Sequence, residues 1–199
     1  MINFLDFHFG RLGNRMFQSA FLYAFARSNN IDFYFQNPEW FKGYENEIKS
    51  LFKQSGEMLD YVAIHVRRGT NPQNPNEPAY NKNSFYTDLS QTDYYDKAID
   101  YFKNEKFLVF SDNIGYCKEK WGNDPRFSFS EKSELEDFNL MSRCKHQIIA
   151  NSTFSWWAAY LNQNPDKIIL APEETQYYAD GIARTKYPAE FTQIKCNKK

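Results

Sequence analysis

The sequence predicts an α/β fold with parallel sheets, and three observations support this prediction. Short apolar runs alternate along the chain with segments whose apolar residues recur at helical spacing. The run at residues 61–66 is largely apolar and β-branched, as is typical of a strand buried on both faces of a parallel sheet. Hydrophobic residues make up 42% of the 199 residues and aromatic residues 19%, which is enough for a sizeable core and excludes wholesale disorder.

The residue pattern at the start of the chain predicts a strand, a glycine turn, a helix and a second strand. Residues 2–9 alternate in polarity as a strand does, and the glycines of residues 10–14 interrupt them. Apolar residues then recur at helical spacing over residues 12–25. A second strand is expected at residues 31–35, and a short helix at residues 45–52.

From residue 61 onward the alternation becomes regular. Strands are expected at residues 61–66, 107–110, 127–129, 148–150 and 167–171. Helices are expected at residues 95–102, 114–121, 135–144 and 156–161. The apolar stripe of the third helix consists of Leu135, Phe138, Met141 and Cys144. Residues 71–91 carry three prolines among polar residues and predict a long loop.

Composition excludes several classes of protein. The chain has 24 basic and 25 acidic residues, so it offers no broad electrostatic surface for nucleic acid or an anionic membrane. No apolar run approaches the roughly 18 residues of a membrane span, and the first ten residues lack the basic start of a signal peptide. Because three scattered cysteines cannot form a disulfide framework, we expect reduced thiols and a cytoplasmic protein.

The sequence also lacks the common motifs for metals, phosphate loops and hydrolase nucleophiles. No two aspartates stand two residues apart, and His8, His65 and His146 are widely dispersed. Neither G-x-x-x-x-G-K-[ST] nor G-x-S-x-G occurs. We therefore expect neither a metal ion nor a cofactor.

Three strand ends carry candidate ligand-binding residues, and ligands of open parallel sheets bind where such ends meet. The glycine turn at residues 10–14 allows close backbone approach and leads into a helix start with free amides. Arg67 and Arg68 follow the strand at residues 61–66 and point to opposite faces of an extended chain, so one of them can face a cleft. Residues 151–155 place hydroxyls at a helix amino terminus, which favours an anion.

Each strand end also has a purely structural interpretation. The glycines suit a tight turn, the arginines suit a structural ion pair, and the hydroxyls suit an ordinary helix cap. His65 alone is more typical of a core histidine than of a catalyst. Together the three ends describe a cleft of amides, hydroxyls and guanidinium groups, which suits a diphosphate held without metal.

Four blocks of the sequence resemble the motifs of the α-1,2-fucosyltransferase family, glycosyltransferase family 11. Residues 10–18 read GRLGNRMFQ and resemble the family's GGLGNQMFQ opening. Residues 62–69 resemble its HVRRGD motif, and residues 107–112 resemble its FxVFSDD block. Residues 136–157 are similar to the family's longest signature, and the four blocks follow one another in the family's order.

The resemblance implies a GT-B-like architecture of two Rossmann-like halves with parallel sheets. It implies an acceptor-side half in residues 1–60 and a half that binds the GDP-sugar in residues 61–199. Because family members place more chain before the arginine strand, the amino-terminal half is expected to be heavily trimmed. The implied reaction is metal-independent, inverting transfer of L-fucose from GDP-fucose to a glycan hydroxyl, typically O2 of a galactoside.

The resemblance also implies roles for individual residues. Arg67 is expected to be catalytic, because it holds the β-phosphate and stabilises departing GDP. His65 is expected beside the nucleoside, and Asp137 is expected to accept hydrogen bonds from the guanine edge. Arg68 is expected to give structural support.

The remaining GDP-sugar contacts are expected to surround the diphosphate. They come from Gly13 and Asn14 in one half and from Ser152, Thr153 and Phe154 in the other. Trp156 and Trp157 could flank sugars, but their helical placement favours core packing.

Several assignments stay open. Thr70 stands where the family has an aspartate, so any brace or proton-handling role of that carboxylate is missing. The acceptor base is unassigned, and the candidates by location are Asp6, His8, Glu77 and Asp112. The alternatives to fucosyl transfer are a non-catalytic nucleotide-sugar or glycan-binding remnant and a transferase for another GDP-sugar. The expected partners are a nucleotide sugar and a glycan acceptor, and a homodimer could cover apolar surface.

Overall fold

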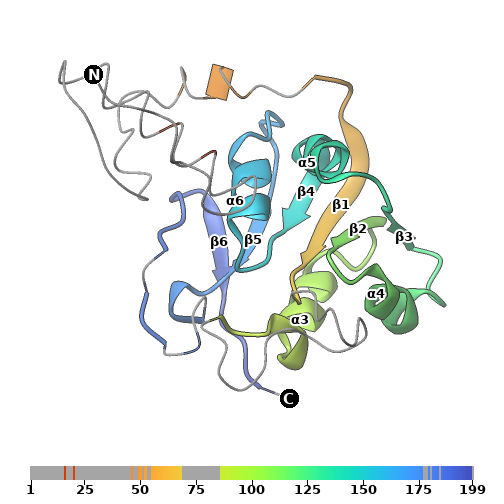
Figure 1. The fold of residues 1–199 in the computed structure, drawn as a ribbon, viewed down its shortest axis with the longest axis vertical. Coiled ribbons are helices and arrows are strands. Elements are labelled where there is room, and N and C mark those ends of the chain that lie inside the picture. Colours follow the sequence, from red (N-terminus) through yellow and green to blue (C-terminus); the bar gives the residue numbers. More distant parts are fainter. Residues whose placement is uncertain are drawn as a thin grey trace.

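The computed structural model describes the greater part of the chain from residue 55 onward. The residues described are 16, 20, 46, 49, 50, 52, 55–68, 86–176, 179, 181–183 and 185–198. They form an α/β domain in which helices cover both faces of a parallel sheet (Figure 1). The predicted fold class, α/β with a parallel sheet, is therefore confirmed.

Six strands pair in parallel in the order β3-β2-β1-β4-β5-β6. The strands are β1 (Leu59–Val66), β2 (Phe107–Ser111), β3 (Phe127–Phe129), β4 (Cys144–Ile148), β5 (Ile169–Pro172) and β6 (Phe191–Ile194). The described α-helices are α3 (Tyr94–Tyr101), α4 (Ile114–Trp121), α5 (Glu134–Ser142) and α6 (Thr153–Tyr160). Short 3-10 helices occur at η3 (Leu89–Gln91) and η4 (Glu174–Gln176).

The direction in which the chain builds the sheet reverses beside β1. From β1 the chain passes outward through β2 to β3, and it then returns to add β4, β5 and β6 on the other side. β1 and β4 are therefore neighbours, with Ile64 opposite Ile148. Ligands of such sheets bind in the crevice outside the carboxyl ends of the two strands at which the order reverses.

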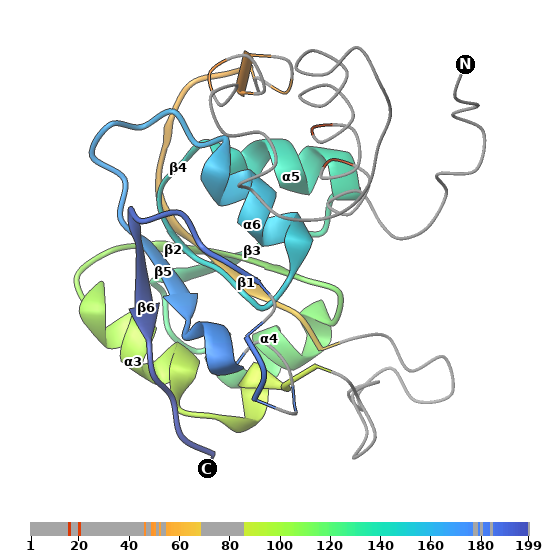
Figure 2. The same ribbon diagram turned by 90° about the vertical axis from the view of Figure 1, so that its left-hand side faces the viewer.

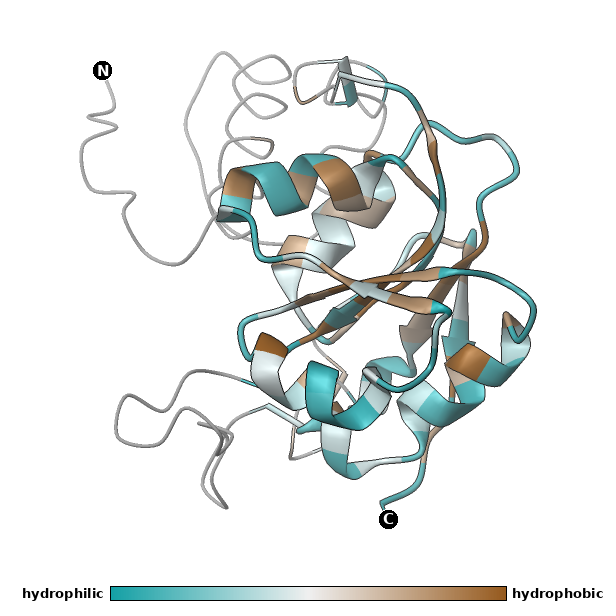
Figure 3. Cartoon of the chain, turned by 90° about the vertical axis from the view of Figure 1, so that its right-hand side faces the viewer, coloured by the Kyte–Doolittle hydropathy of each residue, from teal (hydrophilic) through white to brown (hydrophobic). Residues whose placement is uncertain are grey.

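The side chains of β1 alternate between two hydrophobic layers. Val62, Ile64 and Val66 pack in the layer that contains the buried residues of α3 and α4, whereas Ala63 belongs to the layer of α5 and α6. Figure 2 shows these two pairs of helices on opposite faces of the sheet. Figure 3 shows long hydrophobic stretches in the central strands and many hydrophilic residues in the helices that cover the sheet.

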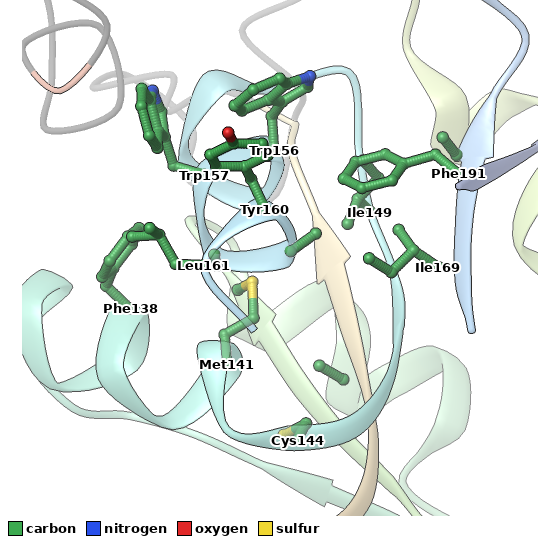
Figure 4. Packing of buried hydrophobic residues seen from close by; sticks show 14 of the residues in the cluster. Phe138, Met141, Cys144, Ile149, Trp156, Trp157, Tyr160, Leu161, Ile169 and Phe191 are labelled. Carbon is green, nitrogen blue, oxygen red and sulfur yellow. The ribbon is translucent and has the colours of Figure 1, made fainter. Parts of the chain in front are cut away.

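The layer of α5 and α6 is rich in aromatic rings (Figure 4). Trp156 and Trp157 are 1% and 0% exposed, and their ring centroids are 5.3 Å apart. Trp156 also stacks on Tyr160 at 5.0 Å. The core interpretation of the two tryptophans is therefore confirmed, and they fix α6 against the sheet.

The structure confirms most predicted elements after residue 61, and α4 and β3 have their predicted bounds. The helix predicted at residues 135–144 is wrong at both ends. Ser133 and Glu136 form a capping box that starts α5 at Glu134, and the exposed fraction of Leu135 is 67%, so Leu135 is not part of a buried stripe. Cys144 belongs to β4.

The strand predicted at residues 148–150 is misplaced, because β4 covers Cys144–Ile148. β4 was not predicted at these residues because it contains polar residues that are nevertheless buried. Nδ1 of His146 accepts a hydrogen bond from the Ile168 amide at 3.0 Å, and Nε2 of Gln147 donates to the Met141 carbonyl at 2.5 Å. These bonds give partners to Nδ1 of His146 and Nε2 of Gln147, two side chains whose polarity suggests an exposed position.

Two other boundaries differ from the prediction. α6 begins at Thr153 rather than at residue 156, so more of the hydroxyl-rich segment is helical. β6 was not predicted, because Thr192 and Gln193 make it a short polar edge strand.

Little of the predicted amino-terminal half lies within the described residues. Met16 and Ala20, from the helix predicted at residues 12–25, are helical and buried in the layer of α5 and α6. Asn46, Lys49 and Ser50, from the predicted short helix, are helical. The predicted strands at residues 2–9 and 31–35 lie outside the described residues, and the division into two halves stays a prediction.

Two further features bear on the sequence-based expectations. The three cysteines are buried free thiols, and burial raises the pKa of Cys117 to about 11 and that of Cys144 to about 12. In the described part of the chain, no helix is long and apolar enough to cross a membrane.

Candidate functional site

Arg67 and Arg68 leave β1 on opposite sides of the sheet. The exposed fraction of Arg68 is 3%, and its guanidinium carbon lies 3.7 Å from the ring centroid of Tyr116 on α4. By the same alternation Arg67 belongs to the side of Ala63, which is the side of α5 and α6. The two arginines thus point to opposite sides, as expected for an extended chain; Arg68 is buried, and the exposed fraction of the Arg67 side chain is 23%.

Asp112 is the partner of both arginines. The register places Val66 opposite Ser111, so Arg67 lies opposite Asp112 one position beyond the paired strands. Nη1 of Arg67 donates to Oδ2 of Asp112, and the backbone amide of Arg68 donates to Oδ1 of the same carboxylate at 3.0 Å. A carboxylate considered from sequence only as a candidate base therefore forms an ion pair with the candidate catalytic arginine.

The segment after β4 turns tightly into α6. The Ala150 amide donates to Oγ of Ser155 at 3.2 Å, and the Trp156 amide donates to the Ser152 carbonyl at 3.0 Å. Ser152 is the N-cap, yet no cap hydrogen bond to its side chain is found within the described residues. The first-turn amides of a helix have no acceptor within the helix. The start of α6 therefore offers donors at the carboxyl end of β4.

The ends of β1 and β4 lie at the same level. Ile64 is opposite Ile148. Arg67 and Asn151 each lie three residues further along, so they occupy corresponding positions after the two strands. Nδ2 of Asn151 donates to the Thr87 carbonyl at 2.7 Å, which ties the turn to the segment that precedes η3. Arg67 and the segment that starts α6 thus follow the ends of two neighbouring strands.

Three aromatic rings join β1, α6 and α5 at this edge. Phe154 lies 5.4 Å from the ring centroid of His65 and 5.5 Å from that of Phe138. Asp137, next to Phe138, lies in the first turns of α5, and its Oδ1 accepts from Oγ of Ser130 at 2.5 Å. Burial raises the pKa of Asp137, and the Ser130 hydrogen bond offsets part of that effect.

Two buried tyrosines at the start of α3 bind carbonyl groups near the strand ends. The Tyr95 hydroxyl donates to the His65 carbonyl at 2.9 Å. The Tyr94 hydroxyl lies within hydrogen-bond distance of the carbonyls of Ile149 (2.7 Å) and Leu170 (3.0 Å). Burial raises the pKa of both tyrosines, so both stay protonated as donors. Sequence reasoning placed Tyr95 on a helical stripe but missed these contacts; the signal was a Tyr-Tyr pair at a helix start.

A pocket of about 610 Å³ lies beside α5 and meets this site at Phe138. Its described lining residues are Met16, Phe52, Lys132, Leu135, Glu136, Phe138, Asn139, Leu140 and Arg143. The pocket is therefore lined mainly by α5, and its described lining does not include Arg67.

The described candidates lie at the end of β1 (His65, Arg67 and Arg68), at the start of α6 (Ser152, Thr153 and Phe154) and in α5 (Asp137). Ring contacts join His65 to Phe154 and Phe154 to Phe138, the neighbour of Asp137, whereas Arg68 faces Tyr116 on the other side of the sheet. Gly13, Asn14 and Thr70 lie outside the described residues, as do the candidate bases Asp6, His8 and Glu77. Within the described ranges no three His, Cys, Asp or Glu residues are grouped so that they could hold a metal ion.

The fold and the site define a Rossmann-like α/β domain with an arginine and a helix start at the switch point of its sheet. Residues 42–193 match the model of glycosyl transferase family 11, and the chain belongs to that family. It is thus a member of a glycosyltransferase family, as the four sequence blocks indicated.

Similar proteins come from bacteria and mammals. The O-antigen biosynthesis glycosyltransferase WbnK of Escherichia coli is 35% identical over 65% of this chain and 43% of its own length. An alpha-1,2-colitosyltransferase of Escherichia coli is 31% identical over 70% of this chain and 53% of its own length. The galactoside 2-alpha-L-fucosyltransferase SEC1 of Bos taurus is 29% identical over 59% of this chain and 33% of its own length. The chain thus spans only about half the length of each of the two bacterial relatives.

Proposed function

We propose that this chain carries the donor-binding part of a GDP-sugar-dependent α-1,2-glycosyltransferase. In this proposal it moves L-fucose from GDP-fucose to a glycan hydroxyl, O2 of a galactoside, with inversion and without a metal ion. The observation that carries the proposal is the position of Arg67 at the switch point, level with the turn that starts α6. Family membership and the names of the mammalian relatives support the choice of reaction.

The chemistry requires stabilisation of a departing diphosphate. When the bond between the sugar and the β-phosphate breaks, negative charge grows on GDP, and groups already aimed at that charge lower the barrier. In the proposal the Arg67 guanidinium donates to the β-phosphate, and the first-turn amides of Thr153 and Phe154, with the Ser152 hydroxyl, donate to the same diphosphate.

The nucleoside is proposed to lie along the edge that joins β1 to α5. Guanine presents two N–H donors on one edge, and Asp137 supplies a carboxylate that accepts them. His65 is proposed to lie beside the nucleoside, supported by its contact with Phe154. This arrangement explains why a half-buried carboxylate is kept in a site where its charge is costly.

A second donor sugar is favoured by one comparison. The bacterial relative that is 31% identical is named an alpha-1,2-colitosyltransferase, so colitose is a rival to fucose as the transferred sugar.

Binding and turnover of the purified chain test the proposal. We expect GDP to bind at least about tenfold more tightly than ADP or UDP, because only guanine pairs its donors with Asp137. We expect transfer from GDP-fucose to a galactoside in the presence of a chelator. GDP binding without turnover on any acceptor would favour a non-catalytic nucleotide-sugar-binding protein, and the same affinity for all three nucleotides would contradict the proposed site.

A further inference from the structure

Asp112 accepts hydrogen bonds from both residues that follow β1. Its Oδ1 accepts from the Arg68 amide at 3.0 Å, and its Oδ2 accepts from Nη1 of Arg67. The preceding residue, Ser111, donates its hydroxyl to the Val66 carbonyl at 2.8 Å and accepts from the Asn113 amide at 2.9 Å. The exposed fraction of the Asp112 side chain is 10%, so its charge is largely removed from water. The carboxylate is therefore fixed to the backbone at the ends of both β1 and β2.

Arg67 needs such a partner if it is to act on a diphosphate. Arginine has a long side chain with many rotamers, and ordering it costs free energy that a bound anion would otherwise have to supply. The guanidinium carries five N–H donors in a plane, and a partner on one side fixes the direction of the others. A carboxylate beside a diphosphate is unfavourable in itself, because the two repel. Any benefit from Asp112 must therefore act through Arg67.

We propose that Asp112 is a positioning residue that holds the Arg67 guanidinium in the orientation needed to bind the donor diphosphate. This inference rests on the proposed function, because it assumes that Arg67 contacts the β-phosphate. It gives the carboxylate after β2 a role in the site other than that of acceptor base. It also supplies a brace for the arginine at a position other than Thr70, where the family's aspartate is missing.

A double-mutant cycle on GDP binding tests the inference without requiring turnover. The four proteins are the parent chain, Asp112→Ala, Arg67→Ala and the double variant, each titrated with GDP in a calorimeter. We expect Asp112→Ala to weaken GDP binding about fivefold or more when Arg67 is present, and by less than about twofold when Arg67 is alanine. A merely structural role of Asp112 would weaken binding equally in both backgrounds, which would overturn the inference.

Matched variants guard against loss of folding. Asp124→Ala removes a comparable carboxylate from Arg126, whose Nη2 lies 2.7 Å from Asp124 just before β3, and it should leave GDP binding unchanged. Asp112→Asn keeps the size of the side chain but can accept at only one of its two terminal atoms. It should show the same dependence on Arg67 with a smaller effect, and it replaces Asp112→Ala as the readout if that variant does not fold.

The outcomes separate this inference from the proposed function. If Arg67→Ala loses GDP binding while both Asp112 variants bind as the parent does, Asp112 is not a positioning residue and the proposed role of Arg67 stands. If Arg67→Ala binds GDP as the parent does, or if the parent does not bind GDP, both the proposed function and the inference are wrong.

Discussion

His65 near the end of β1 and Phe154 in the first turn of α6 lie with their ring centroids 5.4 Å apart. Phe154 is also 5.5 Å from Phe138 on α5. These contacts link a strand and two helices that carry the candidate arginine, the helix-start amides and the candidate guanine acceptor. Because packed rings resist displacement, the relative positions of these groups are set by the hydrophobic layer beneath them.

Asp137→Asn should lower GDP binding without lowering stability. Burial raises the pKa of Asp137, so its ionised form destabilises the folded state at neutral pH, and that cost disappears as the pH falls through the raised pKa. The neutral amide removes the cost and can still accept from Ser130, so the melting temperature at pH 7 should not fall. Guanine should lose an ionic acceptor, which weakens GDP binding about tenfold or more.

The matched control for Asp137 is Glu134→Gln, which neutralises an exposed carboxylate in the first turn of the same helix. It should leave GDP binding unchanged. Equal affinities of the Asp137→Asn and Glu134→Gln variants for GDP would argue against a guanine contact by Asp137.

Gly56 should be much less tolerant of alanine than Gly115. Gly56 has φ +122°, and a Cβ there would clash with Nη1 of Arg143, which already donates to the Glu57 carbonyl at 2.8 Å. Gly56→Ala should therefore lower the free energy of unfolding by about 1–2 kcal/mol. Gly115 lies in α4 with its nearest contact at 3.9 Å, and Gly115→Ala should raise the free energy by up to about 1 kcal/mol. Urea unfolding of both variants measures the difference, and changes of the same sign would contradict this reading.

His146 should make the protein less stable in mild acid. Burial is the largest cause that lowers its pKa from 6.5, and its Nδ1 is the acceptor for the Ile168 amide. The unfolded chain therefore binds a proton at a higher pH than the folded chain does. The His146 contribution is complete above about pH 7 and is lost as the pH falls through 6.5 toward the lowered pKa. Melting temperatures at several pH values should show a steeper fall for the parent than for His146→Gln, and parallel curves would argue against the assignment.

The sequence predicted the sheet best where apolar residues were continuous. Residues 61–66 lie within β1, which begins two residues earlier, at Leu59, and the helix at 114–121 was predicted with its observed bounds. β4 was misplaced because the polar residues Lys145, His146 and Gln147 suggest an exposed segment. In the structure His146 and Gln147 are buried and form hydrogen bonds. Tertiary contacts of this kind cannot be predicted from local periodicity.

The strand ends that carry the candidate site could be predicted from the sequence, but the ion pair between Arg67 and Asp112 could not. The sequence predicted that Arg67 and the segment after residue 150 each follow a buried strand, whereas the pairing of those two strands comes from the observed strand order. The pairing of Arg67 with Asp112 depends on the register of β1 and β2. A shift of one residue would turn Asp112 to the other face of the sheet, and the sequence alone did not specify that register.

The most direct test of the account is the affinity of Arg67→Ala for GDP, measured beside Arg126→Ala. Arg126 forms a comparable ion pair with Asp124 at the opposite edge of the sheet, so it controls for the loss of a positive charge. Arg67→Ala should bind GDP about a hundredfold more weakly than the parent chain, whereas Arg126→Ala should bind it with unchanged affinity. GDP binding of parental strength by a folded Arg67→Ala variant would contradict the account.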